Sequence, residues 1–142
     1  MPALAQDVVR LYDSVPVSCP SEIHTQLANT TIYKGAVAMQ VAGKARPLVA
    51  ATANSVLLGV SLFQQVAGST DRVVADGAPF VFQRGVFAFD GKAGDLPTEA
   101  LIDVVGGVYF GDDNTVQATT PGAHALGGTL RSIRQGFYWV EV

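Results

Sequence analysis

Short apolar runs rich in Val, Phe and Tyr recur at intervals of about ten residues, separated by Gly, Pro, Asn and Asp. Such runs, with little helical periodicity between them, are typical of antiparallel β-sandwiches and barrels. The sequence therefore predicts an all-β fold, a small antiparallel β-barrel or sandwich. The predicted strands cover residues 31–41, 55–65, 71–74, 78–83, 86–89, 107–110, 115–118, 126–134 and 137–142.

The sequence also predicts turns and strand irregularities. Residues 42–44, 76–77, 90–91 and 111–114 tolerate a positive φ or hydrogen-bond their own backbone, which predicts turns there. Gly59, Gly127 and Gly128 instead fall inside apolar runs, where glycine marks a bulge or a close approach of another backbone.

One segment, residues 97–105, predicts a short helix. Thr98 is placed to cap it, and Leu101, Ile102 and Val105 would form its apolar stripe before two glycines end it.

The first thirty residues have a different pattern, with three prolines, small polar residues and only brief apolar pairs. We expect residues 1–30 to form an extended N-terminal arm and residues 31–142 to form the β-rich domain. Such an arm orders on contact with a neighbouring protein; a frayed terminus is the alternative explanation. The candidate partner-binding residues of the arm are Val8, Val9, Leu11, Tyr12, Val15 and Val17.

The composition predicts that part of the surface contacts another protein. Hydrophobic residues make up 49% of the chain and charged residues 15%, against ~25% charged in ordinary domains. This balance predicts contact with a second copy or a partner, although an unusually apolar monomeric barrel is an alternative. The net charge of −3 and the scattered basic residues argue against nucleic acid. No apolar window predicts a membrane helix, and the start of the chain does not resemble a signal peptide.

Residues that carry chemistry are few. His24, His124 and Cys19 have no partner motif, and Ser61 lacks the second glycine of a nucleophile elbow. We therefore expect no enzyme activity, no catalytic residue and no cofactor. The run Asp112, Asp113, Asn114 offers oxygen ligands for calcium, but its spacing favours a hairpin turn.

Several segments in order resemble a known family: Leu-Gly-Val-Ser-Leu at 58–62, Asp-Arg-Val-Val-Ala at 71–75, Gly-Val-Phe-Ala-Phe at 85–89 and Gly-Gly-Val-Tyr-Phe-Gly-Asp-Asp-Asn-Thr-Val at 106–116. Together with Leu-Gly-Gly-Thr-Leu at 126–130 and the closing Trp-Val-Glu-Val, they resemble the head decoration (capsid cement) proteins of tailed bacteriophages. The likeness covers residues 33–142 in short, glycine-led motifs, and the first thirty residues do not take part in it.

The resemblance implies a structural virion protein that binds the outer surface of a phage capsid and stabilises it. The implied partners are the major capsid protein and further copies of the chain in a homotrimer. The implied location is the capsid exterior, after synthesis in the host cytoplasm. Another phage structural module, such as a tail or fibre component, is the alternative, and a small β-barrel ligand-binding protein is a weaker one.

Overall fold

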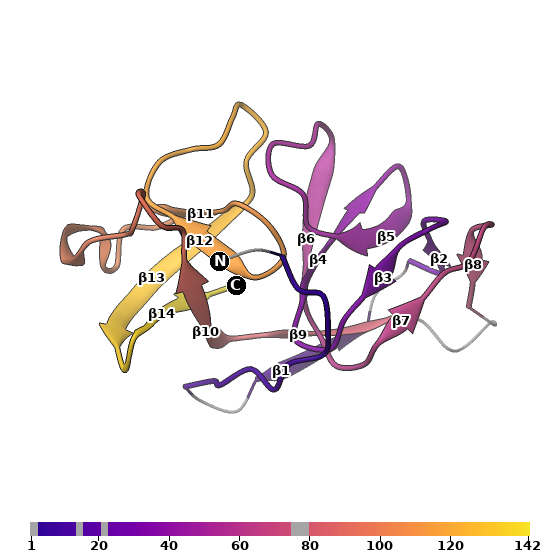
Figure 1. Cartoon of the computed structure of the whole chain (residues 1–142), viewed down its shortest axis with the longest axis horizontal. Coiled ribbons are helices and arrows are strands. Elements are labelled where there is room, and N and C mark those ends of the chain that lie inside the picture. The colour runs from indigo at the N-terminus through magenta and orange to yellow at the C-terminus, as the bar shows by residue number, and fades with distance from the viewer. Residues whose placement is uncertain (1–2, 14–15, 21–22, 75–79) are drawn as a thin grey trace.

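The computed structural model describes residues 3–13, 16–20, 23–74 and 80–142 (Figure 1). It consists of a seven-stranded sheet, a closed five-stranded barrel and a two-stranded sheet. The predicted all-β fold is thus confirmed. Among the described residues, no helix has the length and apolar character needed to cross a membrane.

The seven-stranded sheet is the indigo-to-magenta half of the molecule in Figure 1. Its strands follow the order β1-β9-β6-β4-β5-β2-β8 and curl into a half-barrel. The neighbouring strands are antiparallel except for β2 and β5, which run parallel. The bounds are β1 (Val17–Pro20), β2 (Thr25–Gln26), β4 (Val37–Val41), β5 (Lys44–Pro47), β6 (Ser55–Ser61), β8 (Arg72–Val73) and β9 (Val81–Arg84). The separate two-stranded sheet pairs β3 (Thr31–Ile32) with β7 (Gln65–Val66).

The barrel contains most of the second half of the chain and closes in the order β10-β12-β11-β13-β14. The last strand pairs with both β10 and β13, so the apolar C-terminal strand has no free edge. The bounds are β10 (Val86–Gly91), β11 (Val108–Phe110), β12 (Thr115–Gln117), β13 (Gly127–Arg134) and β14 (Phe137–Glu141).

The two large sheets share one hydrophobic core. Val37 and Met39 of β4 pack in the same cluster as Phe89 of β10 and Phe110 of β11, and the rings of Phe89 and Phe110 meet edge to face at 5.1 Å. A smaller cluster inside the half-barrel contains Ile32, Ala36, Ala38, Ala45, Phe80 and Phe82. The barrel and half-barrel therefore form one packed unit.

Each predicted strand region contains a strand, with two interruptions. Residues 31–41 divide into β3 and β4, and residues 55–65 divide into β6 and β7. The first break is a turn in which the Ala36 N–H donates to the Tyr33 carbonyl, with Gly35 at φ +86°. The prediction missed β5, because Lys44, Arg46 and Pro47 are not the residue types that indicate a strand.

The turn predictions have mixed outcomes. Residues 42–44 form a turn, with Ala42 and Gly43 both at positive φ, between β4 and β5. Residues 90–91 do not, because they continue β10 and pair in parallel with β12. The turn predicted at 76–77 lies outside the described residues. The interior glycines behave as expected: a Cβ on Gly59, Gly127 or Gly128 would clash with a carbonyl oxygen of a neighbouring strand.

The helix predicted over residues 97–105 is wrong: only a single 3₁₀ turn forms, Glu99–Leu101, and Thr98 makes no side-chain cap. Ile102 is already extended, and Asp103 adopts a left-handed φ of +63° while its N–H donates to the Leu130 carbonyl. So short a segment gains more by bonding to β13 than by nucleating a helix.

The first thirty residues were expected to lie outside the compact core, and this expectation is wrong in two respects. They contribute β1 and β2, which pair with β9, β5 and β8. Leu4 and Ile23 also pack against the smaller core cluster. Strands this short cannot alternate long enough to be recognised in sequence. The division of the chain at residue 30 stays a prediction.

Gly59 offers a test of this packing. It has φ +130°, and an added Cβ would lie 2.6 Å from the Gln83 carbonyl oxygen. Gly59→Ala is expected to lower the free energy of unfolding by about 2–4 kcal/mol. Gly68→Ala is the control, since nothing lies within 4 Å of its Cβ position, and it should change stability by less than about 0.5 kcal/mol. Equal stabilities of the two variants in urea unfolding would contradict the β6–β9 contact.

Candidate partner-binding site: the N-terminal segment and the acidic turn

Residues 3–13, here called the N-terminal segment, lie along the junction of the barrel and the half-barrel and contact both. The Val8 N–H donates to the Lys34 carbonyl at 2.9 Å. Further along, Ala88 N–H donates to the Leu11 carbonyl and Asp13 N–H donates to the Val86 carbonyl, each at 2.9 Å. The segment therefore bonds to the edge of β10 and to the turn before β4.

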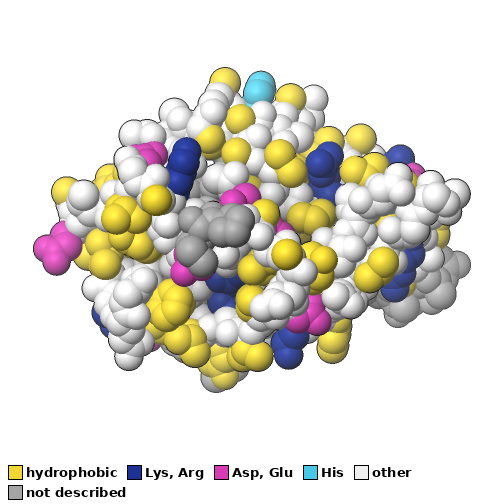
Figure 2. Space-filling model, viewed as in Figure 1, with side chains coloured by type: hydrophobic (Ala, Val, Ile, Leu, Met, Phe, Trp, Pro, Cys, Tyr) yellow, Lys and Arg dark blue, Asp and Glu magenta, His cyan; other side chains and the backbone are white. Residues whose placement is uncertain are grey.

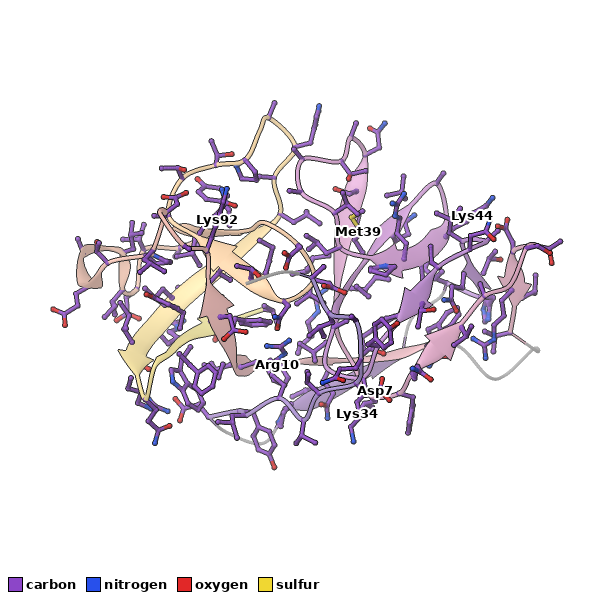
Figure 3. The ribbon with its side chains drawn as sticks, in the orientation of Figure 1. Asp7, Arg10, Lys34, Met39, Lys44 and Lys92 are labelled. Atoms are coloured by element: carbon purple, nitrogen blue, oxygen red, sulfur yellow. The ribbon has the colours of Figure 1, made fainter. Side chains whose placement is uncertain are left out.

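Arg10 is the residue of this segment that reaches furthest into the molecule. Nε donates to the Gly35 carbonyl at 2.7 Å, Nη1 to the Ala88 carbonyl at 2.8 Å and Nη2 to Asn114 Oδ1 at 2.9 Å. The guanidinium carbon lies 4.3 Å from the centre of the Phe89 ring. Figure 3 shows Arg10 between the segment and β10. One side chain thus joins the segment to three separate parts of the fold.

The charge of Arg10 is compensated inside the protein. Burial lowers the pKa of Arg10 to about 10, while the carboxylates of Asp90, Asp113 and Asp112 act to raise it. The guanidinium is therefore protonated at neutral pH, and its contact with the Phe89 ring is a cation–π interaction.

The predicted turn at residues 111–114 is confirmed, and its acidic residues organise it. Asp112 Oδ1 accepts hydrogen bonds from the backbone N–H groups of Asn114 and Thr115, at 2.9 and 2.8 Å. This is the self-bonding that favours Asp in turns. Within the described part of the chain, no three His, Cys, Asp or Glu side chains are grouped to hold a metal ion.

Asp113, in the same turn, contacts both the half-barrel and the N-terminal segment. Its Oδ1 accepts the Leu4 N–H at 2.9 Å, and its carbonyl accepts the Val37 N–H at 2.9 Å. Burial raises the pKa of Asp113 to about 6, and Asp112 adds to this, whereas the Leu4 bond and Arg10 oppose it. The carboxyl therefore titrates at mildly acidic pH.

The candidate partner-binding residues lie on both faces of the segment. Val9 is 82% exposed, Leu11 48%, Tyr12 54% and Val17, on β1, 65%. Val8 points inward and packs against Gly35. A Cβ added at Gly35 would clash with the Val8 side chain. Val15 lies outside the described residues. On the face shown in Figure 2, apolar side chains occupy much of the surface, with a few charged groups among them.

Two hollows flank the segment. The larger, of about 400 Å³, is lined mainly by apolar side chains that include Leu4, Val9, Leu11 and Phe137. The smaller, of about 150 Å³, lies beside Val8, Leu62 and Phe87. Arg10 lines both.

Of the other sequence candidates, only Ser61 is seen to line one of these hollows, the smaller one, among the residues that the structure describes. His124 lies in an exposed stretch between β12 and β13, and the Ser61 hydroxyl donates to the Phe63 carbonyl. His24 is partly buried, with a buried Nδ1 for which the described residues provide no partner. The side chain of Cys19 lies outside the described residues.

The sequence indicated Asp113 as a turn residue but not its hydrogen bond with Leu4, and it did not single out Arg10. The available signal was slight: a lone arginine in the apolar run Val8, Val9, Arg10, Leu11. An arginine in an apolar run indicates either a solvent-exposed position or a buried side chain paired with polar groups. The neighbouring residues in the sequence do not distinguish these two arrangements.

Comparison with known proteins adds no relative: no protein-family model, curated protein or solved structure matches the chain.

The Asp113 carboxyl gives a pH test. Because its folded pKa lies above the usual value of 3.8, the folded state binds the proton more tightly than the unfolded state. The proton-linked stability is present below about pH 4 and is lost as the pH rises through about 6. Relative to Asp113→Asn, the wild type should lose at most about 3 kcal/mol of unfolding free energy across this range. Parallel pH profiles for the two proteins in denaturant unfolding would contradict the shift.

Proposed function

We propose that this chain is a structural virion protein, a decoration protein that binds the outer surface of a phage capsid and stabilises it. The observation that carries the proposal is the row of exposed apolar side chains, Val9, Leu11 and Tyr12, on a backbone that is hydrogen-bonded to the body. Apolar side chains held outward in this way favour a protein partner. The sequence resemblance supplies the identity of that partner, the major capsid protein.

The binding energies indicate that this row of side chains does not suffice for a stable complex by itself. Burying Val9, Leu11, Tyr12 and Val17 would contribute about 4–8 kcal/mol, taking the usual gain for each side chain in proportion to its exposed fraction. Association itself costs about 4–15 kcal/mol. A stable complex therefore needs further contacts, and a homotrimer supplies them by presenting several copies of the row to one surface.

The remaining surface favours protein contact over nucleic acid. The chain has a net charge of −3, which repels DNA and suits a place on the outside of the particle. Other exposed apolar residues, including Phe63 and Val105, offer contacts to neighbouring copies.

A ligand-binding protein is the second candidate, favoured by the 400 Å³ hollow, which is within the size range of ligand sites. Its polar groups argue for a structural role, because Arg10 donates to Asn114, and Asn114 Nδ2 donates to Asp90. These groups line the hollow, but they hydrogen-bond to one another.

The proposal is tested by co-sedimentation with capsids that lack the protein. The wild type should bind, and Val9→Asp should weaken binding about tenfold or more, since a charge replaces an apolar contact. Val73→Asp is the matched control: Val73 is 71% exposed, close to the 82% of Val9, but lies on β8 at the far edge of the sheet. It should bind nearly as the wild type does. A wild type that ignores capsids, or two variants of equal affinity, would overturn the proposal.

A further inference from the structure

We propose that the N-terminal segment presents a preformed binding surface, and that Arg10 is the positioning residue that sets its register. The partner would meet Val9, Leu11 and Tyr12 already in place, rather than capturing a free arm. The identity of the partner rests on the proposed function; the positioning role of Arg10 does not.

From Val8 to Leu11 the side chains alternate as in an extended strand, and Tyr12, after them, is also exposed. Val8 and Arg10 point into the molecule, whereas Val9 and Leu11 are exposed. In an extended chain, a slip of one residue exchanges the two faces. Such a slip would turn Val9 and Leu11 inward and place the Arg10 charge in water. The surface offered to a partner therefore depends on register.

Arg10 is suited to specify that register because its three bonds end on separate elements. Gly35 precedes β4, Ala88 belongs to β10 and Asn114 belongs to the acidic turn. A planar guanidinium meets these three acceptors in one position, and a lysine ammonium does not reproduce the fork. The cation is also placed over Phe89 and near three carboxylates, so moving it outward forfeits all of these interactions together.

Apolar packing holds the segment less firmly than these polar contacts do. Hollows of about 400 and 150 Å³ lie beside it, and Val8, Val9 and Arg10 line both. A void removes the contacts that would otherwise hold the chain in place. Loss of the Arg10 bonds should therefore free the segment while the barrel stays folded, and each partner contact would then require the chain to be ordered first.

The test combines hydrogen exchange of the free protein with capsid affinity. In the wild type, the amides of Val8, Asp13 and Ala88 should exchange slowly, because each donates to a backbone carbonyl. Arg10→Met should speed their exchange about tenfold or more while the β13–β14 amides keep their protection. Its capsid affinity should fall about tenfold or more, and Arg10→Lys should recover part of both effects.

Arg131→Met is the matched control, since Arg131 forms exposed ion pairs with Asp103 and Glu141; it should leave segment exchange and affinity unchanged. Free exchange of the segment amides in the wild type would overturn the inference. So would an Arg10→Met or Arg10→Lys protein whose segment is released but whose affinity is undiminished. If Arg10→Met fails to fold, Arg10→Lys and the wild-type exchange decide the outcome. A wild type that does not bind capsids refutes the proposed function, and the exchange data still decide whether Arg10 positions the segment.

Discussion

The partly buried guanidinium of Arg10 is the constraint that links the N-terminal segment to β10, to the turn before β4 and to the acidic turn. A cation removed from water is costly unless its donors are bonded and its charge is compensated. Here two carbonyls, one amide oxygen, an aromatic face and three nearby carboxylates meet these requirements. Each lies on a different part of the chain from the segment that carries Arg10. The N-terminal segment, β10 and the acidic turn must therefore be in place together.

The same arrangement explains how two sheets act as one domain. Their apolar faces share a core in which Val37 and Met39 pack with Phe89 and Phe110. On the polar side of this contact, the acidic turn of the barrel bonds to the start of β4 through the Asp113 carbonyl. The N-terminal segment lies along the junction, bonded to Asp113 at Leu4 and to β10 at Leu11. The exposed side chains of the segment are thus held at the junction of the two sheets.

The sequence predicts most strands of this molecule and its turns at 42–44 and 111–114, but not its long-range polar contacts. Apolar runs rich in Val, Phe and Tyr reveal which strands contribute to a core, as they do for β10 and β14. They do not reveal which distant element covers these strands. Arg10 bonds to residues 25, 78 and 104 positions away, and no local pattern encodes those distances. For this reason the sequence predicts only an extended arm over residues 1–30. The wrong helix prediction at 97–105 has the opposite cause. The local capping and spacing signals favour a helix there, but the Asp103 N–H donates to the Leu130 carbonyl of β13 instead.

The state of the Arg10 side chain in the free protein tests this account most directly. Its Nε–H group should give a resolved, slowly exchanging nuclear magnetic resonance signal at neutral pH, because Nε donates to the Gly35 carbonyl. Ring current from Phe89, whose centre lies 4.3 Å from the guanidinium, should also displace the Arg10 side-chain signals from those of exposed arginines. Comparison with Arg10→Lys assigns them. A rapidly exchanging Arg10 signal that coincides with those of the exposed arginines would contradict the account.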